Sequence, residues 1–344
     1  MRFARFLPGN QKEWLWLSLR LLAITALLGY SLYFSVYVPP PPTPNRLPFQ
    51  GKEEQDLARR LRGHVHQLAT RIGQRNIWTP GSMEATTLYI LTTLANQGHT
   101  PIQQEFEAYQ QQILNIGVEI PGQWAPEEIL VIGAHYDTVV HSPGADDNAS
   151  GVAVLLELAR LMRSETPQRT IRLVAFANEE PPFYFSDEMG SRHYARSCKE
   201  HGEKIVAMLS LETMGHYSDT LNSQHYPFPL GLFYPNTGNF LAFVGNLPSR
   251  PLLHRAINTF RQQAAIPSQG LAAPGMITGI AWSDHWSFWQ EGYPGIMLTD
   301  TAFFRSSLYH TAGDTEETLD YDRLARVVGG LLHTVLTLAD QSAP

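Results

Sequence analysis

The sequence predicts an α/β fold, a three-layer α/β/α sandwich around a mixed, mostly parallel central sheet, preceded by one transmembrane helix. Three observations support this. Short apolar runs alternate with longer amphipathic stretches after residue 50, which is typical of strands and helices that follow one another along a chain. Several runs are apolar on both faces, as central strands are when helices cover both sides of a sheet. The third observation is an uncharged apolar stretch near the N-terminus.

That stretch, residues 21–38, contains no charged side chain. A helix needs about 20 apolar residues to cross a bilayer. The stretch is longer than this when it is counted from Trp14, provided that the side chain of Arg20 extends toward the membrane interface. A cleaved signal peptide is the alternative, but the stretch is long for one and no A-x-A-like cleavage site follows it. We therefore expect an uncleaved membrane anchor.

Basic residues precede the anchor, namely Arg2, Arg5 and Lys12. Positive charge favours the cytoplasmic side, so the remainder of the chain should lie on the periplasmic or extracellular side. Pro39 to Pro44 form a stiff, extended spacer. The expected organisation is a cytoplasmic tip and anchor in 1–38, a proline-rich linker in 39–50, and one catalytic domain in 51–344.

The predicted elements of this domain are assigned from apolar periodicity. Strands are expected at 113–120, 129–134, 171–177, 206–211, 240–244 and 295–299. Helices are expected at 53–72, 81–96, 149–163, 187–199, 251–264, 283–290 and 321–338. Ligands of such folds bind beyond the carboxyl ends of the strands, so functional side chains should gather there.

Composition excludes some functions. The net charge is −7 and no long basic run is present, which argues against nucleic acid as the main partner. Cys198 is the only cysteine, so neither an internal disulfide nor a cysteine-based zinc site is expected. Its neighbours show no arrangement that would activate a thiol.

Polar side chains do follow the predicted strands. His135 and Asp137 come after the run at 129–134, and residues two apart in an extended chain point to the same side. His135 could bind a metal while Asp137 holds the imidazole from behind, a common arrangement at metal-bound histidines.

The loop GADDNASG, residues 144–151, is a second candidate. Asp147 or Asn148 could simply cap the following helix. Two adjacent carboxylates repel each other, however, unless a cation lies between them. Glycines at both ends suit a close approach of the backbone to a bound ion.

Two consecutive glutamates, Glu179 and Glu180, end an almost wholly apolar strand. Buried carboxylates are costly unless they are paired or metal-bound. Since neighbouring side chains point to opposite sides, one could bind metal and the other act as general base. Glu212 and His310 complete the set, and two histidines with carboxylates suit a catalytic Zn²⁺ site.

The order of the motifs HYD, GADDNASG, NEE, LET and HTAGDT resembles the co-catalytic zinc exopeptidases of the bacterial leucyl aminopeptidase type. Relatives of that family include glutamate carboxypeptidase and the single-zinc glutaminyl cyclases. The resemblance covers residues 63–340. It implies a peptide substrate, two Zn²⁺ ions per chain and the removal of residues from the N-terminus of the peptide.

The resemblance also implies roles for individual residues. One zinc would be held by His135 and Glu212 and the other by Glu180 and His310, with Asp146 as the bridging carboxylate.

Glu179 matches the general base of the family, and Asp137 matches the partner of the zinc-bound histidine. Tyr309 matches a tyrosine that stabilises the tetrahedral intermediate in some relatives. The segment SDHWSFW resembles a helix beside the substrate pocket, which makes Asp284 and His285 candidate substrate-binding residues.

Two departures from the family pattern stand out. Glu212 occupies a position where aspartate is common. The stretch after Glu180, PPFYFSDEMGS, is longer than the compact version and could form a lip over the site.

Other functions remain open. A glutaminyl cyclase would share the fold, and a carboxypeptidase would need a cation for the substrate carboxylate, for which Arg192, Arg250 and Arg305 are candidates. A catalytically silent binding protein should have lost ligands, and none is lost here. A serine hydrolase is disfavoured because no G-x-S-x-G motif is present.

Overall fold

The computed structural model of the protein describes residues 8–38 and 51–340. The chain divides into two compact units, Met1–Tyr37 and Val38–Pro344. The predicted proline-rich linker lies outside the described residues.

The first unit consists mainly of helix α1 (Gln11–Val36), whose first turn is capped by Asn10. The side chain of Asn10 accepts a hydrogen bond from the backbone N–H of Glu13 at 2.9 Å. No residue of α1 is buried, and its most apolar window has a mean hydropathy of 1.6. The helix therefore has the length and composition of a membrane-spanning segment.

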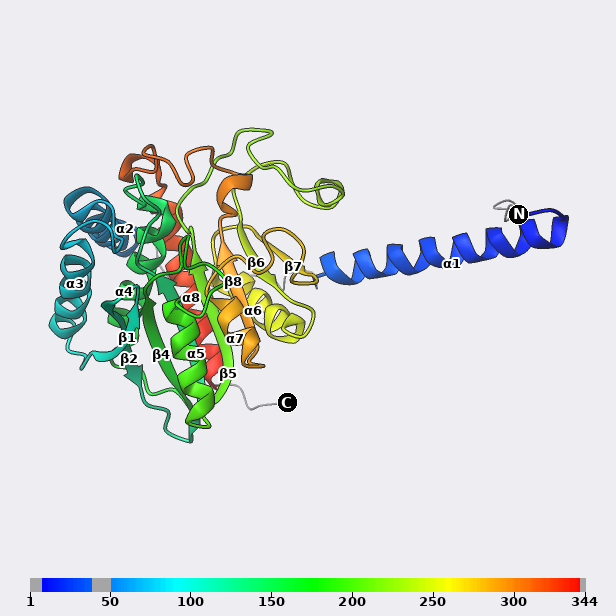
Figure 1. The fold of residues 1–344 in the computed structure, drawn as a ribbon. Coiled ribbons are helices and arrows are strands. Elements are labelled where there is room, and N and C mark those ends of the chain that lie inside the picture. Colours follow the sequence, from blue (N-terminus) through cyan, green and yellow to red (C-terminus); the bar gives the residue numbers. More distant parts are fainter. Residues whose placement is uncertain (1–7, 39–50, 341–344) are drawn as a thin grey trace. The chain divides into compact units, whose positions relative to one another are not determined.

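The second unit is built on one eight-stranded sheet with the strand order β1-β2-β4-β3-β5-β8-β6-β7 (Figure 1). The strands are β1 (Ile102–Ala108), β2 (Gln111–Ile120), β3 (Ala125–His135), β4 (Arg169–Phe176), β5 (Lys204–Glu212), β6 (Leu241–Gly245), β7 (Ser268–Ala272) and β8 (Gly295–Thr299). The four central strands β4, β3, β5 and β8 pair in parallel. Antiparallel pairs flank them, β2 against β4 and β6 against β8, so the sheet is mixed as predicted.

Helices cover both faces of this sheet. They are α2 (Lys52–Val65), α3 (Ser82–Asn96), α4 (Gly151–Met162), α5 (Gly190–Glu200), α6 (Arg250–Gln263), α7 (His285–Gln290) and α8 (Tyr321–Asp340). Alternate residues of β3 point to opposite faces. Leu130 and Ile132 join the core under α2, α4, α6 and α8, whereas Val131 packs with Cys198 of α5 and Phe288 of α7. The predicted three-layer sandwich is confirmed.

Two edge strands were not predicted. β1 is rich in polar residues and buries only alternate side chains near its end, because an edge strand faces solvent on much of its surface. β7 has five residues and contains Gly270, so it lacks a clear apolar run. Apolar periodicity therefore identified the central strands and missed these edges.

Candidate metal centre and active site

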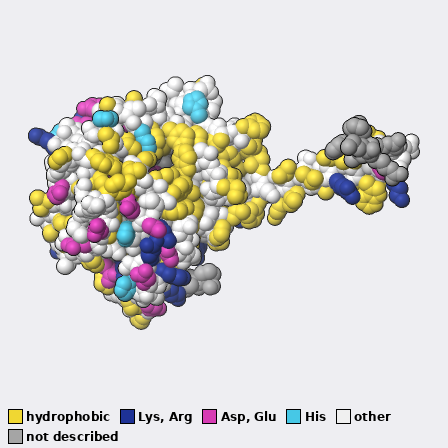
Figure 2. Space-filling view, in the orientation of Figure 1, with side chains coloured by type: hydrophobic (Ala, Val, Ile, Leu, Met, Phe, Trp, Pro, Cys, Tyr) yellow, Lys and Arg dark blue, Asp and Glu magenta, His cyan; other side chains and the backbone are white. Residues whose placement is uncertain are grey.

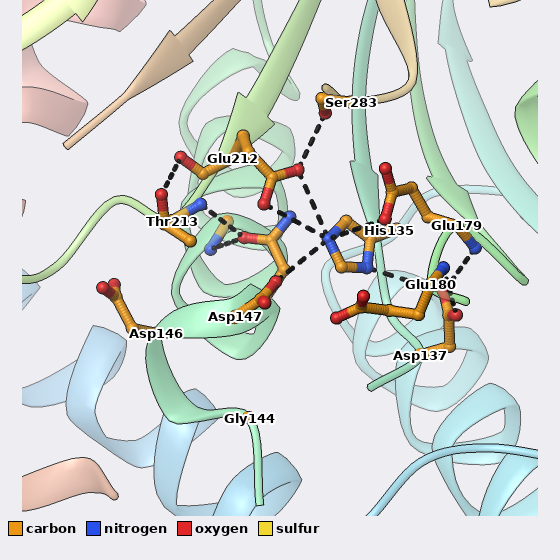
Figure 3. Close-up of polar contacts among 12 residues, drawn as sticks. His135, Asp137, Gly144, Asp146, Asp147, Glu179, Glu180, Glu212, Thr213 and Ser283 are labelled. Atoms are coloured by element: carbon orange, nitrogen blue, oxygen red, sulfur yellow. Dashed lines mark hydrogen bonds and ion pairs between the residues drawn. The ribbon is translucent and has the colours of Figure 1, made fainter. Parts of the chain in front are cut away.

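The candidate residues come together at the carboxyl edge of the sheet (Figure 3). His135 ends β3 and Glu212 ends β5. Glu179 and Glu180 follow β4, and His310 lies in the loop between β8 and α8. This is the position at which parallel strands present their following loops to a ligand.

One half of the cluster surrounds Nε2 of His135, a side chain with no exposed surface. This nitrogen lies 3.3 Å from Oδ1 of Asp147 and 3.3 Å from Oε2 of Glu212. Oε2 of Glu179 is 4.0 Å away. The hydroxyl of Ser283 donates to the same Oε2 of Glu212 at 2.7 Å, which orients that carboxylate toward the histidine.

The other half surrounds Nε2 of His310. It lies 3.0 Å from Oδ2 of Asp147 and 3.2 Å from Oε2 of Glu180. Asp147 therefore directs one carboxylate oxygen toward each histidine. A carboxylate in this position can bridge two metal ions.

The structure corrects the prediction for Asp146. Figure 3 shows its side chain turned away from His135, and its Oδ1 accepts the N–H of Gly215 at 2.8 Å. Burial, together with nearby Asp300 and Asp314, raises the pKa of the Asp146 carboxyl well above its usual range. Adjacent side chains of this loop point to opposite sides, so only one of the two aspartates can reach the histidines, and that one is Asp147.

The backbone of the loop is held by Asp314. Its two carboxylate oxygens accept the N–H groups of Asp146 and Asp147 at 2.8 and 3.1 Å. At Gly144 the φ angle is +60°, and a Cβ would lie 2.3 Å from the carbonyl oxygen of Asp147. Glycine is therefore required where the loop begins.

Asp137 connects the histidine to the glutamates. Its Oδ1 and Oδ2 accept the backbone N–H groups of Glu179 and Glu180 at 3.0 and 3.1 Å. Oδ1 also lies 3.5 Å from Nδ1 of His135. Asp137 thus occupies the position behind His135 that the sequence predicts, and it also holds the turn that carries both glutamates.

The donor set fits a metal. Three groups each bring ligand atoms within 4.8 Å of one another, namely His135 with Asp147 and Glu212, His135 with Glu179 and Glu180, and Asp147 with Glu180 and His310. Both oxygens of Asp147 and Nε2 of His310 are buried and make no hydrogen bond of good geometry. Buried polar atoms without partners are rare unless a ligand or ion satisfies them.

A cavity of about 430 Å³ opens onto this cluster. It is lined by Glu179, Glu180, Pro181, Tyr184, Glu212, Trp282, Phe303, Tyr309 and His310. Pro181 and Tyr184 belong to the long stretch that the sequence predicts to form a lip, and they do border the cavity. Burial raises the pKa of the Tyr309 hydroxyl well above its usual range, and the nearby carboxylates raise it further. The tyrosine therefore stays protonated and can donate a hydrogen bond.

The two predicted substrate-binding residues lie elsewhere. His285 is fully buried, its Nε2 pairs with the carbonyl oxygen of Ile280 at 2.8 Å, and burial lowers its pKa to about 4. Asp284 is also fully buried, and burial raises its pKa to about 7. Neither lines the cavity. Asp284, just before the short helix α7, and His285, its first residue, both point into the protein interior. Trp282 lines the cavity instead.

Three residues of the site were missed by the sequence analysis. Tyr184 lies in the cavity wall, with a buried hydroxyl that has no hydrogen-bond partner. Ser283 orients Glu212, and Arg75 supports the backbone around Gly144. Ser283 lies within the SDHWSFW motif and Tyr184 within the stretch PPFYFSDEMGS, but nothing in the sequence distinguishes Arg75 from other arginines.

Sequence comparisons relate the chain to known proteins. The profile of peptidase family M28 matches residues 115–335. The uncharacterized protein YfbL of Escherichia coli is 44% identical over 220 residues, which are 59% of this chain and 65% of YfbL. A probable leucine aminopeptidase of Trichophyton verrucosum is 28% identical over 235 residues, 63% of this chain and 55% of that protein. The match thus spans less than two thirds of either relative.

Solved structures share the fold. BSAP, a zinc aminopeptidase from Bacillus subtilis, superposes with a TM-score of 0.65 at 15% identity, over 83% of this chain and 95% of BSAP. A glutaminyl cyclase from Fimbriiglobus ruber gives a TM-score of 0.60 at 18% identity, over 87% of this chain and 99% of the cyclase. At these identities the likeness concerns the fold alone.

Proposed function

Because the chain belongs to peptidase family M28 and is therefore a zinc-dependent hydrolase, we propose that Val38–Pro344 is a di-zinc aminopeptidase. One observation carries the choice of aminopeptidase. Among the described residues, the charged side chains in the cavity wall are the carboxylates of Glu179, Glu180 and Glu212 beside His310, without any lysine or arginine. Such a wall offers no cation that could pair with the C-terminal carboxylate of a peptide, which a carboxypeptidase would need.

The candidate cations for a carboxypeptidase do not line this cavity. Arg305 is buried and donates to Gln224 and to the carbonyl oxygens of His216 and Phe240. Arg192 pairs with Glu291. Both guanidinium groups therefore pair with groups of the protein itself and do not face a substrate in this cavity.

In this proposal His135 and Glu212 would hold one zinc and His310 and Glu180 would hold the other, and Asp147 would supply a carboxylate to the site. Zinc bound there would supply Lewis acidity to the scissile carbonyl and to the attacking water. His135 and His310 must be neutral to serve as ligands. Asp137, whose Oδ1 lies 3.5 Å from Nδ1 of His135, favours the tautomer that leaves Nε2 free for the metal.

Glu179 is the proposed general base. It lines the cavity, and burial raises the pKa of its carboxyl group well above its usual range. A carboxylate with a raised pKa can take a proton from water and return it to the leaving amine. The hydrogen bond from its backbone N–H to Asp137 holds it in position for both transfers.

Tyr309 and Tyr184 are the proposed donors to the developing oxyanion. Both tyrosines line the cavity, and burial together with the nearby carboxylates raises the pKa of each hydroxyl. A donor that is already in place when charge develops stabilises the transition state more than the ground state.

The proposed location is the outer face of a membrane. Helix α1 would span the bilayer, and Arg2, Arg5 and Lys12 before or at its start favour a cytoplasmic N-terminus. The peptidase unit would then act in the periplasm or outside the cell.

A substrate panel tests the proposed activity. The full chain is assayed on aminoacyl substrates, on peptides with a blocked N-terminus and on peptides that begin with glutamine, each with and without a chelator. We expect release of the N-terminal residue from unblocked peptides only, lost with chelator and restored by zinc. Cyclisation of N-terminal glutamine, cleavage of blocked peptides from the C-terminus, or a chain without bound metal would each reject the proposal.

A further inference from the structure

Two long segments of the peptidase unit carry no charged side chain. Asp, Glu, Lys and Arg are absent between Asp219 and Arg250 and again between Arg261 and Asp284. The segments meet in space, because the hydroxyl of Tyr234 donates to the carbonyl oxygen of Gly270 at 2.7 Å.

These segments expose large apolar side chains. Met276 is 93% exposed, Phe228 91% and Leu232 76%. Phe233, Ile277 and Trp282 of the same two segments are partly exposed. We call these six residues the apolar face. Figure 2 shows a broad area of hydrophobic side chains over the segments coloured yellow-green to orange in Figure 1. Monomeric proteins seldom leave such an area uncovered unless it binds something.

The apolar face lies beside the mouth of the active-site cavity. An adjoining, mainly aromatic and aliphatic cavity is lined by residues of both uncharged segments, such as Tyr226 and Leu271. It shares Glu212, Trp282, Phe303 and Tyr309 with the cavity above the metal centre. Whatever covers the apolar face is therefore next to the route by which a peptide reaches the zinc ligands.

We propose that the apolar face docks on the surface of the membrane in which helix α1 is anchored, so that the active site works at the lipid interface. This rests on the membrane anchor of the proposed function. Residues 39–50 can extend to at most about 40 Å, so the peptidase unit cannot move far from the bilayer. Tethering at this distance makes even a weak contact with lipid persistent.

The chemistry of the apolar face fits lipid. Aromatic and aliphatic side chains insert at the boundary of headgroups and acyl chains. The uncharged segments add no ionised side chain that would have to lose its water there. A soluble peptide would not cover the whole apolar face, because Phe228, Leu232 and Met276 do not line either cavity.

Site-specific fluorescence in lipid nanodiscs tests the docking. Cys198 is 4% exposed, and burial raises the pKa of its thiol, so an introduced cysteine can be labelled selectively in the full chain. Leu232→Cys places an environment-sensitive label on the apolar face. Trp124→Cys is the matched control, because Trp124 is 82% exposed and precedes the first residue of β3, at the opposite edge of the sheet.

We expect a quencher carried on the lipids to quench the label at residue 232 several-fold more than the label at residue 124. High salt should not reduce this difference, because the contact involves no charged side chains. Equal quenching at both positions would overturn the docking. So would a label at 232 that is shielded from an aqueous quencher but untouched by the lipid quencher, since a protein would then cover the face.

The same samples are assayed on an aminoacyl substrate, which separates the two proposals. Hydrolysis without lipid quenching at 232 rejects the docking and leaves the aminopeptidase intact. Lipid quenching at 232 without hydrolysis supports the docking and rejects the aminopeptidase. A chain that does not co-purify with nanodiscs rejects the anchor and the docking together.

Discussion

Arg75 donates a hydrogen bond to the carbonyl oxygen of Gly144 at 2.7 Å, at the start of the loop that carries Asp147. The same guanidinium, which is fully buried, donates to the carbonyl oxygens of Tyr136 and Pro143. One side chain therefore joins the segment after His135 to the loop of Asp147, and it does so through backbone carbonyl oxygens alone.

Replacing Arg75 by methionine should lower both stability and metal affinity. The change leaves several buried carbonyl oxygens without donors, which should cost about 3 kcal/mol or more of unfolding free energy. Denaturant unfolding of the metal-free protein and zinc titration measure the two effects. An unfolding free energy equal to that of the wild type would contradict the structural role.

Asp147→Asn and Asp146→Asn should behave differently. Asp147 lies between the two histidines, so its amide variant should bind zinc at well below the wild-type content. The carboxyl group of Asp146 faces Gly215 and Asp300 instead of the histidines, and asparagine can still accept the N–H of Gly215. Metal content per chain, measured by mass spectrometry, decides between them. An equal loss of zinc in the two variants would mean that Asp146 is also a metal ligand.

Glu179→Gln should keep its zinc and lose turnover. Glutamine cannot accept and return the proton, and general acid–base catalysis contributes roughly 10²–10⁴-fold to rate. The measurement is kcat on an aminoacyl substrate together with zinc content. A variant with normal kcat would remove Glu179 from the mechanism.

The two cavity tyrosines should affect kcat rather than KM. Tyr309→Phe or Tyr184→Phe removes one hydrogen-bond donor, and loss of one oxyanion donor costs about 10²–10³-fold in kcat. Steady-state kinetics of both variants show which hydroxyl contacts the reacting carbonyl. If both retain wild-type kcat, neither tyrosine stabilises the oxyanion.

Zinc binding should release protons. In the metal-free cluster, burial and Asp147 raise the pKa of Glu180 to about 8. Burial lowers the pKa of His310, but Asp147 and Glu180 outweigh it and raise the value to about 10. The pair of Glu180 and His310 therefore holds protons at neutral pH that must leave before both groups can bind metal.

Zinc affinity should accordingly fall as the pH falls from about 7 to about 6, by about tenfold per unit for each proton displaced. Calorimetry in buffers of different ionisation enthalpy counts the protons released. An affinity independent of pH over this range would mean that the cluster is already deprotonated before metal arrives.

The amino-acid sequence alone predicted the central strands and the position of the site. Apolar runs on both faces predicted the central strands, since a sheet covered by helices must be apolar on both sides. The acids and histidines after those runs predicted the edge where His135, Glu180, Glu212 and His310 meet.

The tertiary structure decided which of two adjacent aspartates faces the histidines. Asp146 and Asp147 are the same residue type side by side, and no periodicity distinguishes them. Contacts with Asp314 and Gly215, distant in sequence, orient the loop so that Asp147 reaches the histidines. Arg75 and Tyr184 likewise gain their places only when the chain folds, because burial and the direction of a side chain depend on residues that the local sequence does not contain.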